Sequence, residues 1–112
     1  MTLGENQEAF MRDVEKLLSY LHINGYSVRG GELERTQAQQ EIYYNTGKSK
    51  TMQSNHLKRC AIDLHIFKNG VWLQSKQDLQ EIGNYWESLS SFNRWGGNFS
   101  SFLDTPHFER NC

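Results

Sequence analysis

The chain has 112 residues and carries a formal net charge of -1 from 12 basic and 13 acidic residues. This length allows one domain over residues 1–112 and excludes a second. Near-neutral charge without an extended Lys/Arg cluster excludes a protein held on nucleic acid by phosphate contacts. No apolar run approaches the roughly 20 residues of a membrane span, and the N-terminus, MTLGENQEAF, lacks both parts of a secretory signal. We therefore expect a monomer made in the cytoplasm, without a membrane anchor or a nucleic-acid partner.

Three segments show the apolar spacing of amphipathic helices. The first runs from Glu5 to Ile23 and ends at Asn24-Gly25, a pair that favours a left-handed stop. The second begins after Thr36, which can cap it, and ends at Gly47. The third follows a capping-box pattern that begins at Ser75.

Strand patterns lie between the helices. Residues 60–67 alternate, which predicts a strand with Asp63 and His65 on the face opposite the apolar side chains. Asn69-Gly70 then predicts a two-residue hairpin turn into residues 71–73. Residues 26–28 favour a further short strand. The tail from residue 92 is rich in aromatic and turn residues and contains the only proline, Pro106. The whole pattern predicts a small α+β domain, with a short antiparallel sheet and about three helices.

The cysteines and tryptophans have mainly structural interpretations. Cys60 lies in the alternating apolar run, where a buried free thiol is common, and nothing marks an oxidising compartment. We therefore predict that Cys60 and Cys112 do not pair. Trp72 and Trp86 stand at hairpin and helix positions typical of core residues, while the sequence leaves the role of Trp95 open.

Two histidines occur in settings that suit a metal site. His56 lies in a loop seven residues before Asp63, and an Asp on a strand needs a reason because strands disfavour it. His107 closes the segment Asp104-Thr105-Pro106-His107. His56, Asp63 and His107 are suitable ligands for a catalytic zinc, with Asp104 left as an acid or base. From spacing alone, unrelated surface histidines remain the competing interpretation.

Three motifs give the chain a family resemblance. Residues 54–63, SNHLKRCAID, resemble the S-x-H-x-x-G-x-A-x-D signature of the zinc D-Ala-D-Ala carboxypeptidase and L-alanyl-D-glutamate endopeptidase family, which includes many phage endolysins. Trp95-Gly96-Gly97 followed by DTPHFE at residues 104–109 resembles its closing segment. Arg35-Thr36 with Gln40 is similar to its R-S/T-x-x-x-Q element.

Two residues depart from the family pattern. Arg59 stands where the pattern has Gly, so either the backbone there needs no positive φ or the loop has been rebuilt. His65 has no counterpart among the family's ligands, and we favour a surface residue over a partner that holds Asp63.

The resemblance implies the fold, cofactor and site. It implies a Hedgehog and D,D-peptidase-like domain with a zinc ion (Zn2+) on the sheet, held by His56, Asp63 and His107. Asp104 would take a proton from the activated water, and Arg35 would stabilise charge on the substrate carbonyl. Supporting or substrate-binding roles fall to Ser54, Gln40 and Trp95.

The resemblance also implies the substrate, which is peptidoglycan. Asp rather than Glu at position 104 favours the L-Ala–D-Glu bond of the stem peptide, as in phage-type endopeptidases. A D,D-carboxypeptidase is the alternative within the enzyme class, and a non-catalytic zinc-binding or peptidoglycan-binding module is the alternative outside it. The missing signal fits an endolysin that is made inside a bacterium and released to the cell wall, where its cleft alone recognises peptidoglycan.

Overall fold

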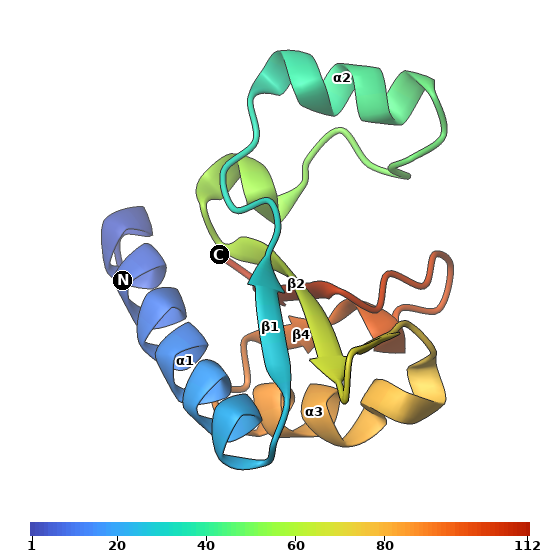
Figure 1. Ribbon diagram of the computed structural model, residues 1–112. Coiled ribbons are helices and arrows are strands. Elements are labelled where there is room, and N and C mark those ends of the chain that lie inside the picture. The colour runs from blue at the N-terminus through green and yellow to red at the C-terminus, as the bar shows by residue number, and fades with distance from the viewer.

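An antiparallel sheet of five strands divides the molecule into a helical side and an open side (Figure 1). The computed structural model describes residues 1–112. The strands follow the order β1-β2-β5-β4, and β3 pairs with the end of β2. The elements are α1 (Leu3–Ile23), β1 (Ser27–Gly30), α2 (Gln37–Asn45), the short 3-10 helix η1 (Asn55–Lys58), β2 (Ala61–Lys68), β3 (Val71–Leu73), α3 (Lys76–Ser88), β4 (Asn93–Trp95), η2 (Gly96–Asn98) and β5 (His107–Arg110).

All three predicted helices are present, and each begins at a side-chain cap. The Thr36 and Ser75 side chains accept hydrogen bonds from the third residue that follows each of them, as predicted. The first helix begins at Leu3, earlier than predicted, because Thr2 and Glu5 form a capping box. None of these helices is long and apolar enough to cross a membrane.

The two faces of β2 have different neighbours. Leu64 and Ile66 join the core, where they pack with apolar residues of α1 and α3. Asp63, His65 and Phe67 occupy the alternate positions and face the open side. Figure 1 shows α1 and α3 beside the sheet, while α2 stands apart, beyond the start of β2. The alternation in residues 60–67 therefore places the candidate site on the face without helices.

The C-terminal tail contains two strands that the sequence pattern did not predict. β5 lies between β2 and β4, and all four of its residues are buried. Three of those four, His107, Glu109 and Arg110, are polar, so the strand lacks the apolar alternation that would reveal it. β4 has only three residues. Pairing between distant segments, rather than local pattern, creates both strands.

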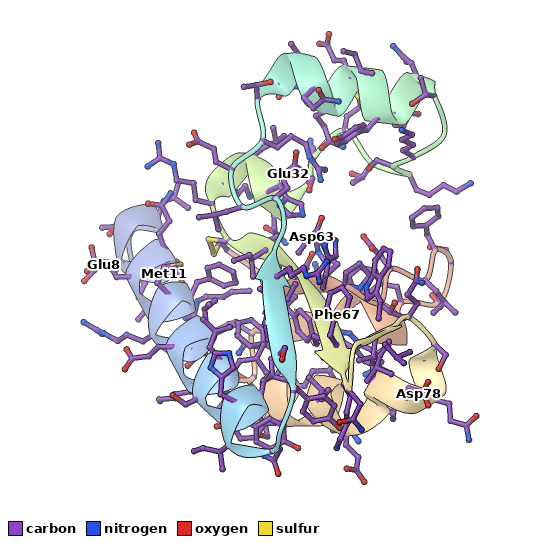
Figure 2. All side chains as sticks on the ribbon, in the orientation of Figure 1. Glu8, Met11, Glu32, Asp63, Phe67 and Asp78 are labelled. Atoms are coloured by element: carbon purple, nitrogen blue, oxygen red, sulfur yellow. A yellow bond between two sulfur atoms is a disulfide. The ribbon has the colours of Figure 1, made fainter.

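The prediction of two free thiols was wrong, because Cys60 and Cys112 form a disulfide (Figure 2). Cys60 immediately precedes β2, and Cys112 follows β5, which runs antiparallel to β2. The Arg110 backbone N–H donates to the Cys60 carbonyl and extends this pairing toward the C-terminus. The unpredicted strand β5 thus brings the two cysteines together.

The tryptophans divide differently from the prediction. Trp86 is fully buried, as expected, and its indole N–H donates to the Glu109 carbonyl at 3.0 Å. Trp95 is also fully buried. Trp72, predicted as a core residue, is 44% exposed because β3 pairs only with the end of β2 and its Trp72 position faces the open side.

Candidate metal centre

Three side chains from two strands and a 3-10 helix converge on one point of the open face. Asp63 Oδ1 lies 3.3 Å from His56 Nε2 and 3.5 Å from His107 Nδ1. The three candidate ligand atoms all lie within 4.8 Å of one another. Asp63 and His107 are direct partners across β2 and β5, so the sheet register itself brings them together.

The fold around η1 determines how His56 presents its ring. The Ser54 hydroxyl caps η1 and accepts a hydrogen bond from the His56 backbone N–H at 3.2 Å. His56 Nδ1 lies 2.9 Å from the Leu33 carbonyl oxygen, which can only accept a hydrogen bond. The proton therefore resides on Nδ1, and the Nε2 lone pair points at Asp63.

A buried carboxylate orients the second histidine in the same way. His107 Nε2 lies 2.7 Å from Glu109 Oε1, so Nε2 donates and Nδ1 faces the site. Glu109 is held in turn by the Asn55 side chain at 2.9 Å and by the Arg94 guanidinium. Such outer contacts fix the orientation and basicity of a metal-binding histidine.

Sequence reasoning assigned no role to Glu109, Asn55 or Arg94. Glu109 follows His107 by two residues, a spacing that places both side chains on one face of a strand. That signal could be used only if a strand were predicted in the tail, and the polar composition of β5 conceals it.

The three converging atoms are buried and lack hydrogen-bond partners. His56 Nε2, Asp63 Oδ1 and His107 Nδ1 are all without partners in the structure. Buried polar atoms are normally satisfied, so three that face one another indicate a site for a cation. Two imidazole nitrogens and a carboxylate oxygen are also a donor set that suits zinc. The residues present therefore fit a metal ion.

The ionisation of these residues is consistent with a cation site. Burial raises the pKa of Asp63, but His107 and His56 outweigh it and hold that pKa well below its usual range. Burial likewise lowers the pKa of His107, but the carboxylates of Asp63 and Glu109 outweigh it and raise that pKa to about 9. At neutral pH and without a metal ion, His107 therefore carries a proton on both ring nitrogens, and a cation bound at Nδ1 would displace one of them. The pocket thus favours positive charge at its centre.

Asp104 lies at the edge of this cluster. Its Oδ2 is 3.8 Å from His107 Nδ1, and its side chain is 38% exposed. Burial raises the pKa of Asp104, and the charge of Asp63 adds to that rise. The Asp104 backbone N–H donates to the Gly96 carbonyl at 3.0 Å. A Cβ on Gly96 would lie 2.1 Å from the Asp104 carbonyl oxygen, so only glycine permits this approach.

Arg35 is held by a network that fixes the direction of its guanidinium. Nε donates to Glu32 Oε1 at 2.5 Å, and Nη1 donates to Gln40 Oε1 at 2.7 Å and to Ser54 Oγ at 3.4 Å. The Tyr43 ring lies beneath the guanidinium, 4.7 Å away. Gln40 is fully buried, so it contacts Arg35 from the interior of the protein.

One cleft of about 840 Å³ connects most of the predicted residues. Figure 2 labels Asp63 and Glu32 close together, where the chain between β1 and α2 passes the start of β2. Neither Gln40 nor Trp95 lines the cleft, because both are fully buried. The Trp95 indole N–H donates to the Thr105 carbonyl at 2.8 Å. The cleft lining includes Arg35, Ser54, His56, Asp63, Asp104 and His107.

Arg59 keeps the left-handed backbone that glycine would favour. Its φ of 56° ends η1, and its backbone N–H donates to the His56 carbonyl at 3.3 Å. Of the two alternatives, a relaxed backbone and a rebuilt loop, the first is therefore wrong. Arg59 therefore has a strained, left-handed backbone three residues after His56.

Replacing Arg59 by Gly is expected to raise the free energy of unfolding by about 0.5–1 kcal/mol, because glycine removes this strain. The ion pair between Arg59 and Glu34 is exposed, so its loss costs little. Arg59→Ala removes the same ion pair but keeps the strain, and it serves as the control. Denaturant titration measures both, and equal stability of the two variants would contradict the strain argument.

The chain has clear relatives among known proteins. A sequence model of the D-alanyl-D-alanine carboxypeptidase family matches residues 47–110. The L-alanyl-D-glutamate peptidase of Listeria phage A118 is 34% identical over 111 aligned positions, and the match covers 97% of this chain and 38% of that protein. The chain thus spans about two fifths of the length of that relative. The fold is similar to that of the Serratia marcescens L-Ala D-Glu endopeptidase ChiX, with a TM-score of 0.74 and 23% identity over 96% of this chain and 84% of that one. From the match over residues 47–110, the chain belongs to the D-alanyl-D-alanine carboxypeptidase family.

Proposed function

We propose that this chain is a zinc-dependent peptidase that hydrolyses the L-Ala–D-Glu bond of the peptidoglycan stem peptide. The observation that carries the proposal is the convergence of three partnerless buried ligand atoms beside Asp104 and Arg35 in one cleft. The relative from Listeria phage A118, itself an L-alanyl-D-glutamate peptidase, supports the choice of bond. The site of action would be the cell wall.

The proposed ligands are His56 through Nε2, His107 through Nδ1 and Asp63 through Oδ1. A zinc ion bound there would supply Lewis-acid chemistry, polarising a substrate carbonyl and lowering the pKa of water. The Leu33 carbonyl and Glu109 hold the two imidazoles in the orientations in which these nitrogens face the site. The chain thus prepares the site before any cation arrives.

Proton transfer is the proposed role of Asp104. A carboxylate there can take a proton from the attacking water and pass it to the leaving amine, which amide hydrolysis requires. Arg35, oriented by Glu32 and Gln40, would stabilise negative charge on the carbonyl oxygen as the tetrahedral species forms.

Removal of the metal tests the cofactor directly. Dialysis against a chelator is expected to abolish release of peptides from purified peptidoglycan, and added zinc is expected to restore it. Circular dichroism should show that the chelated protein stays folded, because the disulfide and core do not depend on the metal. Full activity in the chelator would contradict the assignment.

Product analysis distinguishes the proposed bond from the alternative. The description of the family itself favours a D,D-carboxypeptidase as the second candidate. Mass spectrometry of digested peptidoglycan should reveal new N-terminal D-Glu if the proposed bond is cut. Release of free D-Ala would instead identify the carboxypeptidase, and absence of both products with metal bound would favour a non-catalytic module.

A further inference from the structure

The open face of β2 continues beyond the metal centre as an aromatic surface. His65 and Phe67 follow Asp63 at intervals of two residues, and Trp72 of β3 is the cross-strand partner of Phe67. The Trp72 ring lies 5.1 Å from the His65 ring and is stacked 6.2 Å from the Phe67 ring. Arg29 of β1 holds its guanidinium 4.2 Å from the centre of the Phe67 ring. We call Arg29, His65, Phe67 and Trp72 the aromatic platform.

The platform is outside the cleft but on the same face of the sheet. None of its four residues lines the cleft, and the helices α1 and α3 pack on the opposite face. Figure 2 labels Asp63 near the start of β2 and Phe67 near its end. Cross-strand stacking holds the rings in place, although Trp72 stays exposed. An exposed and ordered aromatic surface beside a cleft indicates a binding role.

We propose that the aromatic platform binds the muramic acid sugar of the wall glycan, to which the stem peptide is attached. This inference rests on the proposed function, because it places the scissile bond at the metal centre. A pyranose ring has an apolar face of C–H groups that stacks on an indole, and hydroxyl and acetamido groups at its edge. Trp72 offers the stacking surface, while Arg29 and His65 offer hydrogen-bonding groups beside it.

The distances along the strand match the substrate. His65 lies two residues and Phe67 four residues past Asp63, or about 7 and 14 Å at the rise of a strand. In the wall, one L-Ala and one lactyl group separate the scissile carbonyl from the sugar. These two units span roughly 7 Å when extended. The sugar ring would therefore lie over His65 and Trp72 when the peptide follows β2.

The charges at the end of the cleft away from the platform support this direction of the stem peptide along β2. Lys48 and Lys50 line the cleft in the segment after α2, which lies beyond the start of β2 and away from the platform (Figure 1). The stem peptide carries its free carboxylates on the C-terminal side of the scissile bond. Those carboxylates suit the lysines, which leaves the platform for the uncharged sugar on the N-terminal side.

The experiment compares two substrates with the metal-loaded full chain. One is an N-acetylmuramoyl peptide that contains the L-Ala–D-Glu bond, and the other is the same peptide with an N-acetyl group in place of the sugar. The quantity measured is kcat/KM for the sugar-bearing peptide divided by kcat/KM for the acetylated peptide. Trp72→Ala is expected to lower this ratio by roughly 5- to 10-fold, which is the effect of losing about one stacking contact. Trp72→Tyr should restore most of the ratio, because a phenol ring can also stack.

Phe92→Ala provides the matched control. Phe92 is 53% exposed and lies under the Arg110 guanidinium, so it resembles Trp72 in exposure and setting, but it precedes β4 and is not part of the platform. This variant should keep the wild-type ratio. Equal losses on both substrates in Trp72→Ala, or no change in the ratio, would overturn the proposal.

A binding measurement separates this inference from the proposed function. N-acetylmuramic acid alone is titrated into the protein while the indole N–H signal of Trp72 is followed by NMR, with Trp72→Tyr used to assign the signal. A saturable shift supports the platform even if neither peptide is cleaved, an outcome that would reject the proposed function alone. The absence of a shift overturns the platform. A shift that depends on protein concentration rather than on sugar concentration also overturns it, because it indicates that a second copy of the chain binds there.

Discussion

Replacing Asp104 by Asn is expected to lower kcat for stem-peptide hydrolysis by about 10²- to 10⁴-fold, the usual contribution of a general acid or base. Asn has nearly the same shape but cannot take up a proton. His56, Asp63 and His107 are unchanged in this variant, so its zinc content should equal that of the wild type. Steady-state kinetics together with elemental analysis of the purified protein measure both quantities.

The control for Asp104→Asn is Glu34→Gln, which removes one negative charge outside the cleft. Glu34 is exposed and forms an ion pair only with Arg59. Its substitution should leave kcat close to the wild-type value. An Asp104→Asn protein that keeps its zinc and turns over at the wild-type rate would remove Asp104 from the proton-transfer role.

Breaking the disulfide is expected to lower the free energy of unfolding by about 4 kcal/mol, because the bond closes a long loop in the unfolded chain. The two cysteines are 52 residues apart in sequence. Cys112→Ser is the suitable variant, because Cys112 is half-buried whereas Cys60 lies fully in the interior. Denaturant titration with zinc present in all samples gives the free energies.

The wild-type protein in a reducing agent should match Cys112→Ser, and the reducing agent should not change the variant. If reduction left the stability of the wild type unchanged, the loop-closure argument would fail. Disulfides persist in oxidising surroundings, so the bond is consistent with the proposed action at the cell wall.

Local sequence patterns predicted the parts of the fold that depend on neighbouring residues. The three helices follow from apolar spacing and from caps such as Thr36 and Ser75. The hairpin after β2 follows from Asn69-Gly70, where both residues adopt positive φ. Alternation in residues 60–67 correctly placed Asp63 on the face opposite the core.

The candidate site was predicted as a set of residues rather than as a geometry. The family resemblance named the three candidate ligands, and the structure brings their partnerless ligand atoms to one point. The family resemblance did not reveal that Glu109 and the Leu33 carbonyl orient the rings of His107 and His56. Those contacts join residues 23 positions apart in one case and depend on the unpredicted strand β5 in the other.

The sequence by itself determined the α+β class, the three helices, the family resemblance and the candidate ligands. These properties are encoded in composition, in short-range periodicity and in contiguous motifs. Only the tertiary structure decided that Cys60 pairs with Cys112, that Trp72 is exposed, and that Arg59 adopts a positive φ. The first two depend on strand pairing between separate segments, and the third on how η1 joins β2. The pairing of β5 with β2 therefore creates both the disulfide and the candidate metal centre.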